Sequence, residues 1–307
     1  MEAGGREELS RIVSAAVHWD CPLSGYTSFA IGGPAEALVT AGDSSELAGL
    51  LELFARRRLA WRIIGRGTNL LVRDEGFAGV VVLLGDGFQQ LEFRACPDDR
   101  TSVVSAGGGC GLAKAARRCM EKGYAGLEFA GGIPGTVGGA VIMNAGAWGE
   151  EIAGILRTVT VLTAEGERIL PRQGLDFGYR CWRDFRTFQG RAVVIGVDLE
   201  LTADDPEQVR RRFVHLQEKR RANQPKGQGN AGSFFKNPEN DSAGRLIERS
   251  GLKGMQIGGA RVSEHHANFL VNAGGATAAD VMALMRLVQE KVREDSGICL
   301  EPEVHFL

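Results

Sequence analysis

The sequence predicts an α+β fold for this chain of 307 residues. Short apolar stretches rich in β-branched residues predict strands, and longer stretches with apolar residues at helical spacing predict helices. Two glycine loops, at 65–69 and 131–139, lie within strand-rich sequence. At roughly 150 residues per domain, this length predicts two or three lobes.

The first part of the chain is expected to contain three helices separated by strands. Apolar residues have helical spacing at 8–18, and a second helix at 44–58 can be capped by Asp43 or Ser44. A third helix is expected at 111–122. The strands of this part are expected at 35–40, 61–64, 69–73, 79–84 and 102–106.

The second part is expected to begin with strands and to end mostly with helices. Strands are expected at 139–143, 157–163, 167–170 and 192–201. An acidic cap before Pro206 starts a helix that runs to about Arg221, where basic residues suit the negative end of the helix dipole. Beyond a polar loop, the pattern predicts helices near 242–250 and 277–296 and strands near 268–272 and 302–306. A domain boundary is expected close to residue 205.

Composition narrows the class of function. The net charge of −2 and the pI near 6.3 give no electrostatic reason to expect binding to nucleic acid or to an anionic membrane. No apolar run approaches the roughly 20 residues that span a bilayer, and the polar N-terminus lacks the apolar core of a signal peptide. The five histidines lack metal-ligand spacing, apart from the adjacent His265 and His266, so no metal is expected.

The cysteine pattern indicates the compartment. The six cysteines form no Cys-x-x-Cys pair and are scattered, at Cys21, Cys96, Cys110, Cys119, Cys181 and Cys299. Such a pattern is typical of a reduced protein with buried thiols. We therefore expect a cytoplasmic protein.

The most informative segment is the glycine-rich stretch of residues 126–147. Five of the nine residues from Gly131 to Gly139 are glycine, and the segment is otherwise largely apolar, unlike a flexible, serine-rich linker. Glycine lets the backbone approach a ligand closely and adopt positive φ, and consecutive backbone N–H groups form a concave anion site. The segment therefore predicts a ligand with phosphates and a large flat body.

The second glycine loop, from Gly65 to Asn69, has the pattern strand–loop–strand. A Rossmann fingerprint needs glycine or alanine at position 70 and a helix after the turn, whereas Leu70 and its non-helical continuation argue against both. The sequence also lacks a P-loop motif. One such turn alone is typical of a hairpin, but two in β-rich sequence predict a dinucleotide held by loops at a sheet edge.

Several positions outside the glycine loops carry reactive groups in unusual contexts. Arg180 follows a turn between two strand-like segments, although a lone arginine is usually a solvated surface residue. Ser233 lies between a glycine and two aromatic residues, so its hydroxyl either occupies an apolar pocket or caps a turn. No Gly-x-Ser-x-Gly elbow surrounds it, which disfavours a hydrolase nucleophile. Glu301 and Glu303 share one face of an extended segment before the apolar C-terminus, where a carboxylate is either exposed or buried beside a ligand.

Seven motifs, in the same order along the chain, resemble one enzyme family. They read TSFAIGGP, GRGTNLL, GLEFAGGIPGTVGGA, GYR, GNAGSFFKNP, SAGRLIE and LEPEV. From about residue 22 to the C-terminus, the chain is similar to the UDP-N-acetylenolpyruvoylglucosamine reductases (UDP-N-acetylmuramate dehydrogenases) of bacterial cell-wall synthesis. It resembles their compact subclass, which lacks a substrate-capping tyrosine loop.

The resemblance implies a two-lobed FAD-binding module of the PCMH (vanillyl-alcohol-oxidase-like) type and a smaller C-terminal α+β substrate domain. The implied limits are 1–20 for an N-terminal extension, 21–205 for the FAD-binding domain, with lobes of about 21–76 and 77–205, and 206–307 for the substrate domain. The implied reaction is the NADPH-dependent reduction of UDP-N-acetylglucosamine enolpyruvate to UDP-N-acetylmuramate through non-covalent FAD, a cytoplasmic step of peptidoglycan precursor synthesis.

By the same resemblance, Arg180, Ser233 and Glu303 carry the chemistry. Hydride transfer from flavin N5 to the β carbon of the enol ether sends charge onto the adjoining carboxylate, which Arg180 stabilises as a permanent cation. Glu303 helps to position that species, and Ser233 gives a proton to the α carbon as general acid. Glu303 is preferred to Glu301 because the family's catalytic carboxylate directly precedes the valine.

The resemblance also implies ligand contacts. The cofactor contacts are Gly65, Arg66, Gly67, Thr68, Asn69, Leu70, Gly131, Ile133, Pro134, Gly135, Thr136, Gly138, Gly139 and Asn144. Asn237 matches a position that contacts the UDP-sugar, and His266 matches one near the nucleotide, with a surface histidine as the alternative. Many relatives have an arginine where this chain has His305, so a phosphate or flavin contact is not carried over to that position.

Two other functions fit part of the pattern. Another PCMH-type flavoprotein oxidoreductase would keep the fold, but covalent flavin attachment is not expected, because the loops at 65–69 and 131–139 contain neither Cys nor His. A non-enzymatic protein that binds flavin or a nucleotide sugar would be yellow without oxidising NADPH.

Overall fold

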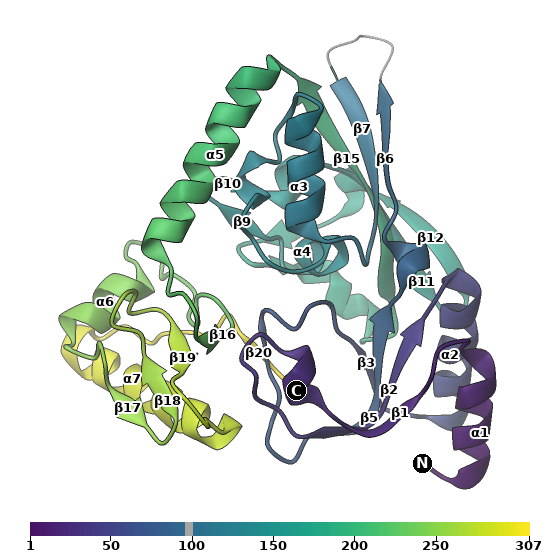
Figure 1. Cartoon of the computed structure of the whole chain (residues 1–307), viewed down its shortest axis with the longest axis horizontal. Helices are drawn as coiled ribbons and strands as arrows, with labels where there is room; N and C mark the ends of the chain where they lie inside the picture. The colour runs from purple at the N-terminus through teal and green to yellow at the C-terminus, as the bar shows by residue number, and fades with distance from the viewer. Residues whose placement is uncertain (96–100) are drawn as a thin grey trace. The chain divides into compact units, whose positions relative to one another are not determined.

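The computed structural model describes residues 1–95 and 101–307, which divide into two compact units (Figure 1). Unit 1 contains Met1–Trp19, Ala37–Gly65 and Gly79–Arg220. Unit 2 contains Asp20–Glu36, Arg66–Ala78 and Arg221–Leu307. Each unit therefore combines segments that are far apart in the sequence. The expected domain limits of 1–20, 21–205 and 206–307 stay a prediction.

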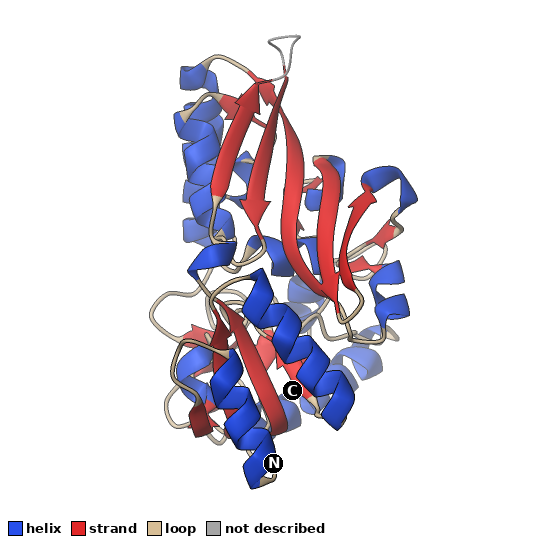
Figure 2. Ribbon diagram, turned by 90° about the vertical axis from the view of Figure 1, so that its right-hand side faces the viewer, coloured by secondary structure: helices blue, strands red, loops and turns tan. Residues whose placement is uncertain are grey.

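The largest sheet of unit 1 has the strand order β12-β11-β15-β7-β6, with the short β8 also paired to β15. All its pairs are antiparallel, and its long strands are clear in Figure 2. The strands are β6 (Leu91–Ala95), β7 (Thr101–Gly107), β8 (Tyr124–Ala125), β11 (Leu156–Thr163), β12 (Gly166–Pro171) and β15 (Val193–Ala203). The strands expected at 102–106, 157–163, 167–170 and 192–201 are thus confirmed.

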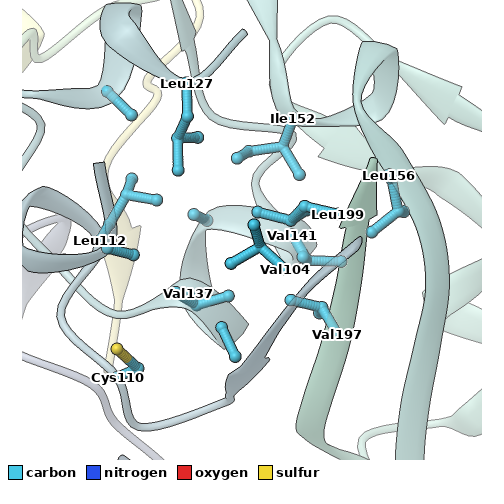
Figure 3. Close-up of a cluster of buried hydrophobic side chains, with 14 of the residues drawn as sticks. Val104, Cys110, Leu112, Leu127, Val137, Val141, Ile152, Leu156, Val197 and Leu199 are labelled. Carbon is cyan, nitrogen blue, oxygen red and sulfur yellow. The ribbon is translucent and has the colours of Figure 1, made fainter. Parts of the chain in front are cut away.

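An apolar core joins this sheet to the elements around the glycine loop at 131–136 (Figure 3). Val104 and Leu199 of the sheet belong to the same buried cluster as Leu112 of α3 (Leu112–Glu121) and Val141 of α4 (Val137–Ile142). Fully burying such a side chain is worth about 1.5–3 kcal/mol. The glycine loop therefore leads directly into a helix that is anchored in the core.

A second core of unit 1 forms around α1 (Ala3–Ile12) and α2 (Ser44–Arg57). Asp43 caps α2 as expected, because its Oδ1 accepts the N–H groups of Ser45 and Glu46, each at 2.9 Å. The strands beside these helices are β1 (His18–Pro22), β2 (Pro34–Ala41), β3 (Trp61–Ile63) and β5 (Phe77–Leu84), in the order β1-β2-β5-β3. β3 runs parallel to β5.

Unit 2 is built on an antiparallel sheet of order β16-β19-β18-β17. Its strands are β16 (Gly229–Asn230), β17 (Gln256–Ile257), β18 (Ala260–Val262) and β19 (Leu270–Asn272), and its helices are α6 (Ala243–Arg249) and α7 (Ala278–Ser296). Thr277 and Asp280 form a capping box at the start of α7. The last strand, β20 (His305–Phe306), runs parallel to β4 (Leu70–Leu71).

The helices expected at 44–58, 111–122, 242–250 and 277–296 are confirmed, as is the helix expected from Pro206, which is α5 (Pro206–Asn223). Three other predictions are wrong in type or extent. The first helix covers Ala3–Ile12 rather than 8–18, because the chain is extended from Val13, whose side chain enters the second core in that conformation. The expected strand at 302–306 is limited to His305–Phe306.

The third error is the strand expected at 139–143, which lies mostly in the helix α4. Glycine and valine have low helix propensity, so the sequence pattern favours a strand there. One local feature and one tertiary feature override it. The Thr136 side chain caps the helix by accepting the N–H of Gly139, and Val137 and Val141 are fully buried.

Among the described cysteines, Cys21, Cys110 and Cys119 are buried, Cys181 is half-buried and Cys299 is exposed, and none of these five is in a disulfide. Cys96 lies outside the described residues. In residues 1–95 and 101–307, no helix is both long enough and apolar enough to cross a membrane. The same residues offer no group of three or more His, Cys, Asp or Glu side chains that could hold a metal ion.

Candidate functional site

The glycine loop at 131–136, called the first glycine loop below, presents backbone N–H groups that have no acceptor among the described residues. Around it, the protein's own oxygens accept the N–H groups of Gly131, Ile133, Val137, Gly138 and Gly139. Among the hydrogen bonds of the described residues, none uses the N–H of Gly132, Gly135 or Thr136. Gly135 has φ +125°, a conformation that favours glycine. The loop therefore offers a short run of donors suited to an anionic or carbonyl-rich ligand.

Three of the five glycines at 131–139 lie closely against other parts of the protein. A Cβ on Gly131 would overlap the ring of Phe213, and one on Gly132 would lie 2.6 Å from Cδ of Arg220. A Cβ on Gly138 would lie 3.0 Å from the carbonyl oxygen of Gly108. Close approach of a ligand, the expected reason for this glycine run, is therefore not needed to explain these three positions.

The two glycine loops meet within unit 1. A Cβ on Gly65, which follows β3, would lie 2.6 Å from Oγ1 of Thr136 at the start of α4. Thr136 is also one of the three residues whose N–H has no acceptor in the part of the chain that the structure describes. The expectation that one ligand contacts both loops is therefore sterically reasonable at this point.

The rest of the other glycine loop, residues 66–69, belongs to unit 2, where it holds the C-terminal strand β20. Asn69 donates from Nδ2 to the carbonyl oxygen of Glu303 at 3.0 Å and accepts the N–H of His305 at 3.1 Å. Leu70 pairs with His305 in the β4–β20 ladder. Gly67 has φ +58°, and a Cβ there would lie 2.8 Å from Cα of Thr27. Arg66 is exposed, and Thr68 is half-buried.

Asn144 makes structural contacts in unit 1. Its side chain is fully buried, donating to the carbonyl oxygen of Gly178 at 3.0 Å and accepting the N–H of Ala153 at 3.0 Å. Both ends of the amide therefore have protein partners. Because Gly178 starts the turn that carries Arg180, Asn144 also helps to fix that turn.

Arg180 lies in a tight hairpin between β13 (Phe177–Gly178) and β14 (Cys181–Trp182). Its φ is +56°, a strained value for a residue with a side chain, and its guanidinium carbon lies 5.0 Å from the centre of the Tyr179 ring. Such strain is typical of functional positions.

A second arginine accompanies Arg180 in unit 1. Burial and the charge of Arg180 lower the pKa of Arg220 to about 10. From the sequence alone, Arg220 is one of the basic residues at the end of α5 that suit the helix dipole. The structure adds the nearby cation and the contact of its side chain with Gly132. Two neighbouring guanidinium groups favour an anionic ligand between or beside them.

In unit 2, Ser233 and Glu303 lie on neighbouring extended segments. Phe235 bridges to Pro302, and the N–H of Glu303 donates to the carbonyl oxygen of Phe234 at 2.8 Å. Ser233, which is half-buried, directly precedes this paired segment. The structure therefore brings the expected proton donor and the expected carboxylate into one local arrangement.

The environments of the two C-terminal glutamates differ. The side chain of Glu301 is 70% exposed and forms an ion pair with Nζ of Lys236 at 2.5 Å. Glu303 is half-buried, and its main chain is bonded on both sides, to Phe234 and Asn69. The more enclosed Glu303 suits a role beside a ligand better than Glu301 does.

Asn237 and His266, which are outside α6, each contact a residue at the start of this helix. Asn237 is exposed, and its Oδ1 accepts the N–H of Ala243 at 3.0 Å. Nδ1 of His266 accepts the N–H of Asn268 at 3.2 Å, and a Cβ on Gly244 would lie 3.2 Å from Cε1 of His266. Burial lowers the pKa of His266, with the nearby His265 and Lys253 acting in the same direction. His266 is therefore neutral at pH 7 and carries its proton on Nε2.

Comparisons with known proteins agree along the whole chain. Residues 224–307 match the family model of the UDP-N-acetylenolpyruvoylglucosamine reductase C-terminal domain. Residues 35–170 match the family model of an FAD binding domain. The UDP-N-acetylenolpyruvoylglucosamine reductase of Desulfosudis oleivorans is 43% identical, covering 99% of this chain and 98% of its own length. That of Heliobacterium modesticaldum is 45% identical, covering 93% and 89%.

A solved structure gives the same result. The crystal structure of the UDP-N-acetylenolpyruvylglucosamine reductase of Thermus caldophilus has a TM-score of 0.80 and 35% sequence identity, and the match covers 95% of this chain and 98% of that one. The expected α+β fold, with an FAD-binding domain and a smaller C-terminal domain, is confirmed. The chain belongs to the UDP-N-acetylenolpyruvoylglucosamine reductase family.

Proposed function

We propose that this chain reduces UDP-N-acetylglucosamine enolpyruvate to UDP-N-acetylmuramate, with NADPH as hydride donor and non-covalent FAD as carrier. Family membership supports the reaction. The structural observation that carries the cofactor assignment is the meeting of the two glycine loops at Gly65 and Thr136, beside N–H groups with no described protein acceptor. Non-covalent binding is supported by the loops at 65–69 and 131–139, which contain neither Cys nor His.

The residues of the loops fit FAD. The N–H groups of Gly132, Gly135 and Thr136 can donate to diphosphate oxygens or to the carbonyl groups of a flavin ring. Gly139 is exposed and leaves open backbone at the start of α4. When bound, FAD supplies two-electron hydride chemistry. Asn69 and Asn144 support the site indirectly, since they hold Glu303 and the Arg180 turn.

Arg180 is the proposed carboxylate-binding residue. Reduction of the enolpyruvyl group moves negative charge onto the substrate carboxylate, and a permanent cation lowers the energy of that charge. Arg220 is a second candidate to bind an anionic part of the substrate or cofactor, because its partly buried side chain lies against Gly132 of the loop and near the cationic Arg180.

Ser233 is the proposed general acid, and Glu303 the residue that positions the reacting group. A hydroxyl is a weak acid in water, but the carbanion-like α carbon formed during the reaction is a strong base. Asn237 and His266, which each contact a residue at the start of α6, are proposed contacts of the nucleotide-sugar. We place the reaction in the cytoplasm, where NADPH and reduced thiols are available.

The test of this function is product formation. The purified chain, NADPH and UDP-N-acetylglucosamine enolpyruvate should give a product heavier by two hydrogen atoms, detected by mass spectrometry. Omitting either NADPH or the enolpyruvyl substrate should give none. Consumption of NADPH by oxygen, without reduction of the enolpyruvyl group, would instead assign the chain to another flavoprotein oxidoreductase.

A further inference from the structure

One face of α5 supports the first glycine loop through four successive contacts. All of them lie within unit 1. The contacting side chains are Arg212, Phe213, Gln217 and Arg220. This spacing places them on one side of a helix. α5 therefore does more than connect two parts of the chain: it sets one boundary of the loop.

The first contact holds the start of the glycine-rich segment. Nε of Arg212 donates to Oε1 of the buried Glu128 at 2.9 Å, and Oε2 of Glu128 accepts the N–H of Gly126 at 2.5 Å. Nη2 of Arg212 also donates to Asp204 at 2.6 Å. These charge-assisted bonds tie α5 to the segment that enters the loop.

The second contact fixes a peptide plane inside the loop. Nε2 of Gln217 donates to the carbonyl oxygen of Gly131 at 3.1 Å. In a trans peptide, the carbonyl group and the following N–H point in opposite directions. Because Gln217 draws the Gly131 carbonyl towards α5, the N–H of Gly132 faces away from α5. That N–H is one of the three with no described protein acceptor.

A side chain at either of these two glycines would displace a side chain of α5. The ring of Phe213 fills the side of Gly131, and Arg220 fills the side of Gly132. Gly131 and Gly132 therefore have no side chains of their own with which to hold this peptide. Its hydrogen bond to Gln217 is the polar contact that selects the orientation of this peptide.

We propose that Gln217 is a positioning residue for FAD: it orients the Gly131–Gly132 peptide so that the Gly132 N–H is presented to the bound cofactor. The proposal rests on the proposed function, since it requires that the loop holds FAD. Without the Gln217 bond, the peptide gains freedom to rotate, and FAD binding must restrict it again. The predicted consequence is weaker FAD binding rather than a less stable protein.

The test compares FAD affinity in two matched variants. Gln217→Leu removes the donor but keeps a side chain of similar size. Gln208→Leu makes the same change at an exposed position on α5. Flavin fluorescence on dilution of the holoenzyme gives the FAD dissociation constant, and thermal unfolding of FAD-free protein gives the stability. Loss of one neutral hydrogen bond should raise the dissociation constant about three- to tenfold in Gln217→Leu. It should leave Gln208→Leu at the wild-type value.

Each outcome is decisive. An unchanged dissociation constant in a folded Gln217→Leu variant overturns the positioning role. A lower melting temperature of the FAD-free protein with normal FAD affinity would make Gln217 merely structural. If Gln217→Leu does not fold, the isosteric Gln217→Glu variant carries the test, and it should weaken FAD binding at least as much, because a carboxylate repels the Gly131 carbonyl. If the wild-type chain binds no FAD, the proposed function itself fails.

Discussion

The backbone around Ser233 and Glu303, the proposed proton donor and positioning residue, is held by hydrogen bonds on neighbouring segments. The carbonyl oxygen and the side chain of Asn268 accept from Phe234 and Phe235, so the segment after Ser233 is held on both sides. The Ser233 hydroxyl can therefore be removed with little expected change in the backbone. This makes serine variants informative about chemistry.

Ser233→Ala should separate the two half-reactions. Reduction by NADPH should stay within a few-fold of wild type, because no proton transfer from Ser233 is needed there. Reoxidation by the enolpyruvyl substrate should fall by about 10²–10⁴-fold, as is typical for loss of a general acid. Stopped-flow absorbance at the flavin band measures both rates. Ser233→Cys should retain more activity than Ser233→Ala, since a thiol can donate a proton. Equal slowing of both steps would make Ser233 a structural residue.

His266 should make stability depend on pH. Its pKa is lowered in the folded state, so the unfolded chain binds the proton more readily. The contribution of neutral His266 to the free energy of unfolding is complete above the pKa of the unfolded chain, about 6.5. It is lost as the pH falls from there through the lower pKa of the folded state. His266→Gln should therefore lose less free energy of unfolding than wild type between about pH 7 and 5. Urea unfolding across this range measures it, with the exposed His215→Gln as control. A wild-type pH profile in His266→Gln would refute the assignment.

At the scale of elements, α4 shows why glycine runs are ambiguous in sequence. Gly138 allows α4 to approach β7 and β15. A Cβ at this position would lie 3.0 Å from the carbonyl oxygen of Gly108 and 3.1 Å from that of Val194. Gly139, the next residue, is exposed. Both are glycines of one motif, yet one serves packing within the protein and the other leaves the backbone open.

This difference predicts opposite tolerance to alanine. Gly138→Ala should lower the free energy of unfolding by about 1–3 kcal/mol, as is typical of overpacking, because its neighbours are backbone atoms that cannot rotate away. Gly139→Ala should change it by less than about 1 kcal/mol, because its nearest neighbour is the Thr136 side chain at 3.3 Å and alanine favours a helix. Chemical unfolding of FAD-free protein measures both. Equal stability of the two variants would contradict the packing argument.

At the scale of the whole molecule, local patterns predicted most of the elements. α2 has a side-chain cap and apolar helical spacing, and β11 and β15 have long β-branched runs, so their signals lie within a few residues. α4 could not be predicted from such local patterns, because its stability comes from burial of Val137 and Val141 in the core. Tertiary contacts of this kind override propensity.

The candidate site was predictable only in part, for the same reason. The motifs pointed to both glycine loops, and the structure places Gly65 against Thr136. They could not show that α5 fills the sides of Gly131 and Gly132, since those contacts join segments about 80 residues apart. They also left Arg220 as an ordinary charge at a helix end. Non-local packing assigns these residues their roles.

The most direct test of the account is an anaerobic absorbance titration of the purified chain. The protein should be yellow, and acid precipitation should leave the FAD in solution. NADPH should bleach the flavin band, and UDP-N-acetylglucosamine enolpyruvate should then restore it without oxygen. A flavin that is bleached by NADPH but stays reduced when the enolpyruvyl substrate is added would contradict the account.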